Sequence, residues 1–448
     1  MAERSIGVTL LGCGVVGGGV ARMLVEQRDD LARRAGVRLD LRHVVVRSAD
    51  AARAKADALG PWAAALPFTT DTDAAIADPA VDIVIELIGG TTLAGTLIER
   101  ALKAGKAVVT ANKSLLAERG ADVFALARKH DTCVAFEASC GGGIPIIQAL
   151  LRDLAGNRID ALLGIVNGTC NFILTKMTQN GWAYDQALKE AQRLGFAEAD
   201  PVMDVSGRDP AQKLSLLASL AFGARVTERD VHVEGIDRLD AADIRFAGEM
   251  GYVIKLLAIA QREPAGQISL RVHPTLVHKS DVLADVSGSF NAISVYGSAL
   301  GHALWYGRGA GRMPTASAVV ADVIGIALGA TPAVFRQIRI LPDQTQPAAV
   351  LPFAELRSRY YLRVMAKDEP GTMAAIATTL GKHNVSISAI LQHEAEDTKL
   401  VPIVITTHLA REGAVATAIR EIDQLAVTDG PAMCLRIIDN PEEFAGEK

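Results

Sequence analysis

The stretch SIGVTLLGCGVVGGGVARML, residues 5–24, decides the fold of the first part of this chain. Ser5–Leu11 is an apolar run that predicts a strand, and Gly12, Gly14 and Gly17 follow it with the spacing G-x-G-x-x-G at the start of a helix. Glycines at these places allow a tight turn and let a pyrophosphate approach the N–H groups of the helix N-terminus. We therefore predict an α/β fold that begins with a Rossmann-type dinucleotide-binding domain.

A second predicted strand, 41–46, runs into Arg47. NAD enzymes usually carry an acid at this place, where it binds the ribose 2′-hydroxyl. An arginine followed by Ser48 favours a 2′-phosphate, so we expect NADP as the cofactor, with NAD as the alternative. The competing interpretation is a solvated arginine at a strand end.

Two further strands, 81–87 and 107–110, extend the predicted parallel sheet. Ligands of such sheets bind at the carboxyl ends of the strands. The loop 89–92 lies at the end of the first of these strands, and Lys113 follows the second. Lys113 is therefore placed to meet a cofactor or substrate, unless it is an ordinary surface lysine.

The stretch GFAEADPVMDVSGRDPAQKLSLL, residues 195–217, gathers several acids and one lysine. Asp209 followed by Pro210 predicts a helix N-cap with proline at the first helical position, and Lys213 lies one turn further on. The positive end of the helix dipole favours loss of the ammonium proton, whereas a neighbouring carboxylate opposes it. A lysine balanced in this way can shuttle a proton near neutral pH. The alternative is a capped helix with an ion pair on a solvated face, and the stretch alone leaves both open.

The middle of the chain adds predicted strands at 133–138 and 161–166. Glycines 141–143 free the backbone for a close approach or an ion contact. Thr169, after the second strand, either caps a helix or presents its hydroxyl to a ligand. The glycine-rich loop 307–311 precedes an apolar helix, which suggests that the chain returns there to the cofactor domain; an ordinary glycine turn is the alternative.

A new series of predicted strands and helices begins in the C-terminal part, after a linker rich in proline and glutamine at 341–357. Its strands and helices follow the order βαββαβ of a ferredoxin-like unit, and they carry no acid–base cluster. We expect this unit, 358–440, to bind a ligand rather than to catalyse. The other expected domains are a Rossmann domain, 1–136 with a returning segment near 307–340, and an α+β substrate and dimerisation domain, 137–306.

The composition narrows the class of protein. The 448 residues allow about three domains. A net charge of −5 and only 4% aromatic residues give no reason to expect a nucleic-acid partner or a membrane surface. Five scattered cysteines without CxxC spacing argue for a reducing compartment, and no apolar run reaches the ~20 residues that span a bilayer. We expect a cytoplasmic protein.

Taken together, the motifs resemble bacterial homoserine dehydrogenases with a C-terminal ACT domain, over nearly the whole chain. They are GCGVVG, TANKSLLA, EASCGGGIPII, IVNGTCNFILTKM, GFAEADPVMDVSGRDPAQKL and GRGAGRMPTASAV, followed by the ACT-like MAKDEPGTMAAIATTL and HNVSISAILQ. The loop GGTTLA departs from the family's usual GG-x-x-P-A at Leu93, which puts the nicotinamide contacts there in doubt. The resemblance implies NADPH-linked interconversion of L-homoserine and L-aspartate 4-semialdehyde, in a homodimer or homotetramer.

The resemblance also implies roles for single residues. Glu198 would hold the substrate amino group, Asp204 would orient the substrate, and Gly168 and Thr169 would line its pocket. Asp209 would position Lys213, the proton shuttle, and Lys113 would face the reacting oxygen. The expected cofactor contacts are Gly12, Gly14, Val15, Val16, Gly17, Arg47, Thr91, Lys113 and Gly309. A monovalent cation such as Na⁺ would bind at Glu137, Cys140, Gly142 and Ile144.

ACT domains bind small amino acids where the first strand turns into the first helix. Here that turn contains Asp368 and Gly371, with Asn384 facing it. The expected effector is L-threonine, acting as an inhibitor; an ACT unit that only assembles the oligomer is the alternative.

Two other functions compete. A phosphorylating semialdehyde dehydrogenase would use Cys140 or Cys170 as a nucleophile, but it would leave Glu198, Asp209 and Lys213 without a role. A regulator that senses nucleotides and amino acids would bind NADP(H) without turnover.

Overall fold

The computed structural model describes residues 5–393 and 400–438, which form two compact units. Unit 1 holds the residues up to Leu162 together with Gln212–Asp230 and Asn291–Ala348. Unit 2 holds Leu163–Ala211, Val231–Phe290 and the residues from Ala349 on. The outermost positions of the expected first and last domains, 1–4 and 439–440, lie outside the described residues.

Unit 1 is built on a six-stranded parallel sheet of order β3-β2-β1-β4-β5-β6, the doubly wound arrangement expected for a dinucleotide fold. Its strands and helices are β1 Ser5–Leu11, α1 Val15–Glu26, α2 Arg28–Ala35, β2 Arg38–Val45, α3 Ala49–Leu59, β3 Phe68–Thr69, α4 Thr72–Ala77, β4 Ile83–Glu86, α5 Leu93–Lys103, β5 Ala107–Thr110, α6 Lys113–Lys129 and β6 Val134–Ala135.

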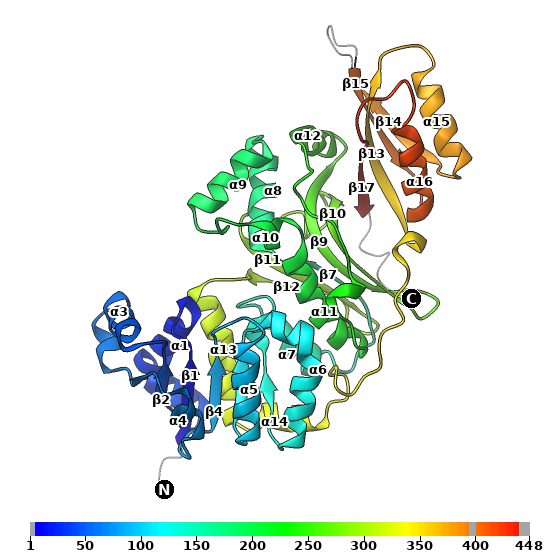
Figure 1. Cartoon of the computed structure of the whole chain (residues 1–448). Helices are drawn as coiled ribbons and strands as arrows, with labels where there is room; N and C mark the ends of the chain where they lie inside the picture. The colour runs from blue at the N-terminus through cyan, green and yellow to red at the C-terminus, as the bar shows by residue number, and fades with distance from the viewer. Residues whose placement is uncertain (1–4, 394–399, 439–448) are drawn as a thin grey trace. The chain divides into compact units, whose positions relative to one another are not determined.

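The helix α13, Arg312–Ala327, packs against this sheet domain although it comes late in the chain. Its residues Ala316, Val319 and Val323 share one buried core with β1 and α1, and α1 and α13 lie next to each other in Figure 1. The two helices approach so closely that a Cβ on Gly19 would stand only 2.9 Å from the carbonyl oxygen of Arg312.

The rest of unit 1 carries the turns that follow β6 and the strands that precede α13. These elements are the 3₁₀ turn Glu137–Ser139, α7 Ile146–Gln148 with the π-helical turn Ala149–Asp153, β11 Phe290–Gly297, β12 Gly301–Arg308 and α14 Ala330–Gln337. The strand β7, Ile159–Ile165, and the helix α11, Arg208–Phe222, each pass from one unit into the other.

Unit 2 contains a mixed sheet in which β9-β10-β17-β13-β15-β14 are neighbours in this order. Its elements are α8 Gly168–Asn180, α9 Tyr184–Arg193, α10 Val202–Val205, β8 His232–Val233, α12 Ala241–Glu249, β9 Tyr252–Arg262, β10 Ile268–His278, β13 Arg357–Lys367, α15 Thr372–Lys382, β14 Ile387–Gln392, β15 Leu400–Thr407, β16 Ala410–Arg411, α16 Glu412–Ile422 and β17 Met433–Ile438.

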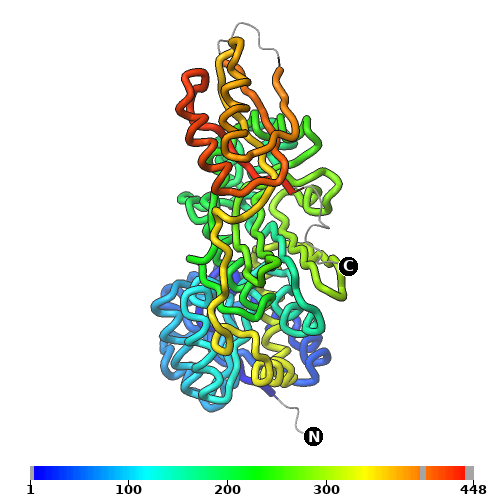
Figure 2. The backbone as a smooth tube through the Cα atoms, turned by 90° about the vertical axis from the view of Figure 1, so that its right-hand side faces the viewer, coloured from blue at the N-terminus to red at the C-terminus, as the bar shows by residue number. Residues whose placement is uncertain are grey.

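The elements from β13 to β17 form the predicted ferredoxin-like unit, which we call the ACT unit (357–438). Its four main strands lie in the order β17-β13-β15-β14, and its core joins Leu362 and Ile405 on the sheet to Ile376 and Val415 on the two helices. Residues 338–356 connect α14 to β13 and contain the 3₁₀ turn Phe353–Glu355 (Figure 2), and the linker limits 341–357 stay a prediction.

Two local predictions were wrong. The strand expected at 133–138 stops at Ala135, because Phe136 leaves the extended conformation and Glu137 turns into a 3₁₀ turn. The helix α11 begins at Arg208, so Asp209 lies inside its first turn and is not its N-cap.

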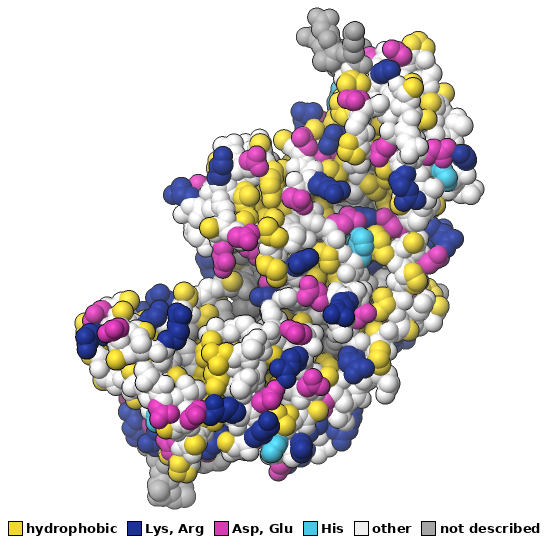
Figure 3. All heavy atoms as spheres, in the orientation of Figure 1, with side chains coloured by type: hydrophobic (Ala, Val, Ile, Leu, Met, Phe, Trp, Pro, Cys, Tyr) yellow, Lys and Arg dark blue, Asp and Glu magenta, His cyan; other side chains and the backbone are white. Residues whose placement is uncertain are grey.

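None of the helices among the described residues is by itself long and apolar enough to cross a membrane. The helices α13 and α14 meet that criterion only as a pair, which is bent by 81°. On the face shown in Figure 3, basic and acidic side chains are interspersed.

Candidate active site

The glycine loop of unit 1 has the shape that a pyrophosphate requires. Gly12 adopts φ +97° at the end of β1, and Gly14 is the N-cap of α1, which has no side chain capping its N–H groups. A Cβ at Gly14 would meet nothing within 4 Å, whereas a Cβ at Gly17 would stand 2.1 Å from the carbonyl oxygen of Gly12. Gly17 thus lets the helix pack on the turn, and the uncapped helix N-terminus at Gly14 fits a phosphate group.

Arg47 follows β2 and is exposed. The neighbouring Ser48 accepts a hydrogen bond from the N–H of Ala51 at 3.1 Å and thereby caps α3. Of the two side chains expected to read the ribose, the serine is therefore engaged in holding a helix, and Arg47 is the one that extends into solvent.

Glu86, at the carboxyl end of β4, organises the neighbouring loop and is completely buried. One of its carboxylate oxygens accepts hydrogen bonds from the N–H groups of Ile88 and Gly89 at 2.8 and 2.9 Å. The other accepts from the Thr110 hydroxyl at 2.7 Å and from the Asn112 amide at 3.5 Å. These bonds tie the ends of β4 and β5 together, and they fix the loop that contains Thr91.

Asn112 places Lys113 at the start of α6. Its amide donates to the carbonyl oxygen of Gly90 at 2.7 Å, and its side-chain oxygen accepts from the N–H of Leu115 at 3.1 Å as the N-cap. Lys113 is the first residue of that helix. Neither Glu86 nor Asn112 is among the predicted site residues, although the single acid in the otherwise apolar run IVIELI, residues 83–88, is a usable signal for Glu86.

The two lysines predicted to act on the substrate belong to neighbouring segments of unit 1. The hydroxyl of Ser114, next to Lys113, donates to the side-chain oxygen of Gln212, next to Lys213, at 3.0 Å. The charges of both lysines act on the Cys140 thiol, which lies 3.9 Å from the backbone oxygen of Lys213. The structure therefore brings Lys113 and Lys213 into one region, as expected.

Cys140 and Cys170 are unsuited to act as nucleophiles because both are buried. Burial raises the pKa of the Cys140 thiol to about 12, against the opposing charges of Lys213 and Lys113. The Cys170 thiol donates to the backbone oxygen of Asp204 at 3.3 Å. A reactive cysteine needs an accessible thiolate, so the cysteine-dependent alternative loses its support.

The loop expected to bind a cation packs closely on the loop that contains Gly309. A Cβ at Gly142 would stand 2.4 Å from the carbonyl oxygen of Gly309, and the N–H of Gly143 donates to the carbonyl oxygen of Arg308 at 3.1 Å. The Glu137 carboxylate accepts from the N–H groups of Ile147 and Gln148, both at 2.8 Å. Among the described residues, no group of three or more His, Cys, Asp or Glu side chains could hold a metal ion. A cation here would therefore depend on backbone oxygens such as those near Cys140 and Ile144.

In unit 2, Asn167 gathers the two acids that precede Lys213. Its side-chain NH₂ donates to Asp204 and to Asp209, at 2.8 Å in both cases. Its side-chain oxygen accepts from the N–H of Cys170 at 2.8 Å as the N-cap of α8. Asp209 lies in the first turn of α11, which also carries Lys213, and Asp204 lies in the preceding helix α10, so one amide binds an acid from each of the two helices. Asn167 is not among the predicted site residues.

The remaining substrate residues lie around the start of α8. The Thr169 hydroxyl donates to the backbone oxygen of Phe196 at 2.7 Å, so it holds the loop that leads to Glu198. Glu198 is exposed, and its backbone oxygen accepts from Gln192 at 3.2 Å. Gly168 is the first residue of α8. Of the expected substrate residues, Asp204 shares a hydrogen-bond partner with Asp209, the residue expected to position Lys213, whereas Glu198 is exposed.

The turn expected to bind an effector has an open helix N-terminus. Gly371 is the N-cap of α15 with φ +96°, no side chain caps this helix, and a Cβ at Gly371 would meet nothing within 4 Å. The buried hydroxyl of Thr372 has no hydrogen-bond partner among the described residues. Asp368 and Asn384 are exposed, and Asn384 adopts φ +56°.

Comparisons with known proteins cover nearly the whole chain. Three family models match it: the NAD-binding domain of homoserine dehydrogenase over residues 12–137, homoserine dehydrogenase over 145–324, and the ACT domain over 360–427. Homoserine dehydrogenases of Neisseria gonorrhoeae and Pseudomonas aeruginosa are 44% and 42% identical, each over 97% of this chain and 99% of the relative. The crystal structure of a homoserine dehydrogenase from Thiobacillus denitrificans is 43% identical, with a TM-score of 0.90 over 98% of this chain and 99% of that one.

Proposed function

The chain belongs to the homoserine dehydrogenase family, and from that premise we propose how its residues divide the work of interconverting L-homoserine and L-aspartate 4-semialdehyde. The enzyme is an oxidoreductase of the CH–OH class and uses a nicotinamide dinucleotide, for which the glycine loop of unit 1 is suited. The observation that carries the assignment of roles is that Asn167 binds both Asp204 and Asp209, the second of which lies in the first turn of the helix that carries Lys213.

The protein's own part in this reaction is to hold the substrate and to move one proton. The nicotinamide, when bound, exchanges a hydride with C4 of the substrate. In the oxidation, Lys213 takes the proton of the C4 hydroxyl, and in the reduction it returns that proton. Lys113, whose segment adjoins that of Lys213 through Ser114 and Gln212, stabilises the negative charge that develops on the substrate oxygen. Asp209 keeps Lys213 in place from one turn earlier.

The substrate is held by groups of opposite charge or matching polarity. Glu198 binds the amino group, Asp204 orients the substrate, and Gly168 with Thr169 lines the pocket. In support, Asp204 already shares Asn167 with Asp209, and Thr169 holds the loop that carries Glu198. We also propose that the first segment of the Rossmann domain ends at 136, that the substrate and dimerisation domain ends at 306, and that the linker before the ACT unit ends at 357.

NADP is the proposed cofactor in preference to NAD because Arg47 is exposed where NAD enzymes carry an acid. Gly12, Gly14 and Gly17 with Val15 and Val16 take the pyrophosphate, and Thr91 and Gly309 take other parts of the molecule. A monovalent cation such as Na⁺ binds the loop at Glu137, Cys140, Gly142 and Ile144. Backbone oxygens supply most of its ligands, because the Glu137 carboxylate already accepts two backbone hydrogen bonds.

The ACT unit is proposed to bind L-threonine and to lower activity. Within the part of the chain that the structure describes, no side chain caps the N-terminus of α15 and the Thr372 hydroxyl has no hydrogen-bond partner, so the first suits a carboxylate and the second is available to a small polar ligand. Asp368 and Asn384 flank that place. We also propose a cytoplasmic homodimer or homotetramer, in which ACT units pair.

One assay tests the central proposal. Purified protein is mixed with L-homoserine and NADP, or with L-homoserine and NAD, and the absorbance of the reduced nicotinamide is followed. We expect turnover with both cofactors and a higher kcat/KM with NADP. No turnover with either cofactor would overturn the proposed function, including the assignment of Lys213, and equal kcat/KM values would overturn the preference for NADP alone.

A further inference from the structure

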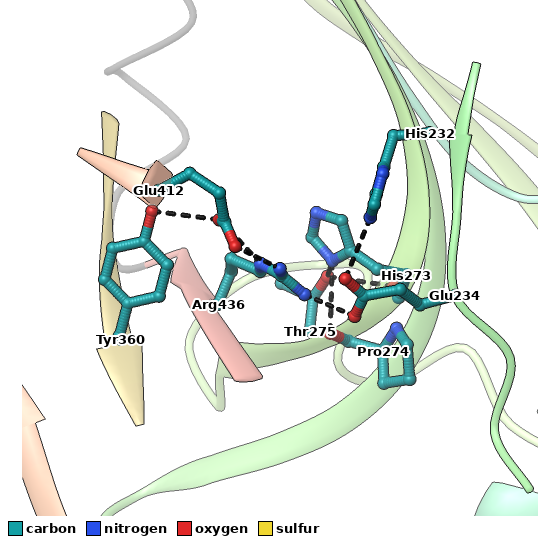
Figure 4. A network of polar contacts seen from close by, with 8 residues as sticks. All are labelled: His232, Glu234, His273, Pro274, Thr275, Tyr360, Glu412 and Arg436. Carbon is teal, nitrogen blue, oxygen red and sulfur yellow. Dashed lines mark hydrogen bonds and ion pairs between the residues drawn. The ribbon is translucent and has the colours of Figure 1, made fainter. Parts of the chain in front are cut away.

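A buried arginine of the ACT unit is paired with a carboxylate of the neighbouring substrate region, within unit 2. Arg436, on β17, is 5% exposed and binds both oxygens of Glu412, the first residue of α16, at 3.1 and 2.5 Å. The hydroxyl of Tyr360 donates to the same carboxylate at 3.0 Å. The remaining guanidinium nitrogen, Nη1, donates to the carboxylate of Glu234, which follows β8 (Figure 4).

Glu234 is held from both sides. Its other carboxylate oxygen pairs with the ring nitrogen Nε2 of His232 at 2.8 Å. Burial raises the pKa of Glu234, but the hydrogen bond to His232 and the charge of Arg436 outweigh burial and lower the pKa to about 2. The carboxylate therefore stays ionised and paired throughout the neutral range.

The segment that carries Glu234 lies directly against the turn between the two site acids. The N–H of Ile236 donates to the backbone oxygen of Val205 at 2.9 Å. A Cβ at Gly235 would stand 2.4 Å from that same oxygen and 2.9 Å from the Cα of Ser206. From the other side, a Cβ at Gly207 would stand 3.0 Å from the side chain of Val233. The turn 205–207 is thus in contact with the segment 233–236 along its length.

This turn joins Asp204 to the first turn of α11, where Asp209 lies, and Asn167 binds both acids. We propose that Arg436 is a positioning residue for the reaction: through Glu234 it fixes the segment 233–236, which fixes the turn 205–207 and hence the places of Asp204 and Asp209. The inference rests on the proposed roles of those two acids. It gives the ACT unit a part in forming the substrate site even when no effector is bound.

The chain offers a matched control for this proposal. Arg363, on β13, is also an arginine of the ACT unit, and it binds both oxygens of Asp243 on α12 at 2.6 and 2.9 Å. Asp243 is completely buried and also accepts from the hydroxyl of Tyr361 at 2.9 Å. Loss of Arg363 therefore removes a comparable ion pair between the same two regions, but not one whose carboxylate adjoins the turn 205–207.

The experiment compares Arg436→Met with Arg363→Met in the full chain, by Tm and by separate KM values for homoserine and for the nicotinamide dinucleotide. Both substitutions should lower Tm, because each removes a buried ion pair. Only Arg436→Met should raise the KM for homoserine, by about 10-fold or more, with the cofactor KM changed less than about twofold. Arg436→Lys should recover part of the lost homoserine affinity because it keeps the positive charge. The recovery should be incomplete because an ammonium cannot bind two carboxylates in the geometry of a guanidinium.

Gly235→Ala provides a second route if Arg436→Met does not fold. It keeps every ion pair but pushes a methyl group against Val205, so it should also raise the KM for homoserine. Equal effects of the two arginine substitutions on the KM for homoserine, or an unchanged KM in Gly235→Ala, would overturn the inference alone. Absence of turnover in the unmodified enzyme would overturn the proposed function, and this inference with it.

Discussion

At the scale of single residues, the decisive group is the ammonium of Lys213. Replacing it with alanine removes a positioned proton carrier without touching the glycine loop of unit 1. We expect Lys213→Ala to lower kcat by about 10²-fold or more while the Kd for the dinucleotide stays nearly unchanged. Lys113→Ala should lower kcat to a similar extent, but it also removes an expected cofactor contact, so only its kcat tests the assigned role. Steady-state kinetics with saturating homoserine and a fluorescence titration with NADPH measure the two quantities. Near-normal kcat in both variants would contradict the assigned roles.

Arg47 is the residue whose replacement should change the preference between NADP and NAD. A charge-assisted contact to a phosphate contributes about 1.5–3 kcal/mol, so Arg47→Asp should reduce the ratio of NADP affinity to NAD affinity by about 10- to 150-fold. Because Ser48 caps α3, Ser48→Ala serves as a control that should lower stability and leave that ratio alone. The Kd values of both cofactors for the three proteins decide the matter, and a constant ratio would show that Arg47 does not read the 2′-phosphate.

At the scale of elements, the helix α13 holds a buried acid against the turn that follows β6. Asp322 accepts from the backbone N–H of Glu137 at 2.8 Å. Burial and the nearby Glu137 raise the pKa of Asp322 to about 8, and burial raises that of Glu137 to about 7. The folded state therefore binds more protons than the unfolded state between about pH 4 and 8, so stability falls as the pH rises through that range. Asp322→Asn should flatten the fall of Tm with pH and raise Tm by about 2 °C or more at about pH 9. A wild-type Tm that does not fall over this range would refute the argument.

Elements whose signals are local could be predicted from the sequence, and contacts between distant residues could not. The strands β1 and β5 have the predicted limits, because each is an apolar run bounded by turn residues. The roles of Asn167 and Glu86 depend on partners up to 42 and 26 residues away, and no periodicity reports such pairs. The local Asp-Pro signature predicts Asp209 as the N-cap, but the helix starts at Arg208, directly after the left-handed Gly207 (φ +83°) and two residues before Pro210.

At the scale of the whole molecule, the question is whether the ACT unit transmits the binding of an amino acid. Threonine must bind a less active state more tightly than an active one, with a coupling of about 1–3 kcal/mol. Gly371→Asp places a negative charge where the effector carboxylate would lie, so it should raise the threonine concentration for half-inhibition by about 5-fold or more. Gly371→Asn is the matched control, since asparagine tolerates a positive φ and carries no charge. Activity is measured against threonine concentration for all three proteins. A flat curve for the unmodified enzyme would remove threonine as effector, and equal curves for the two variants would remove the charge argument.

The position of β17 in the mixed sheet has a consequence for how the protein is made. This strand, Met433–Ile438, lies between β10 and β13, pairing parallel with the first and antiparallel with the second. Its partner β10 is more than 150 residues earlier in the sequence. On the ribosome, the edges of β10 and β13 that pair with β17 therefore stay unpaired until Ile438 has emerged. Such edges invite pairing with other chains. Nascent molecules of this enzyme should therefore depend on chaperones until late in their synthesis, and a premature stop before Met433 should yield aggregates rather than a smaller soluble enzyme.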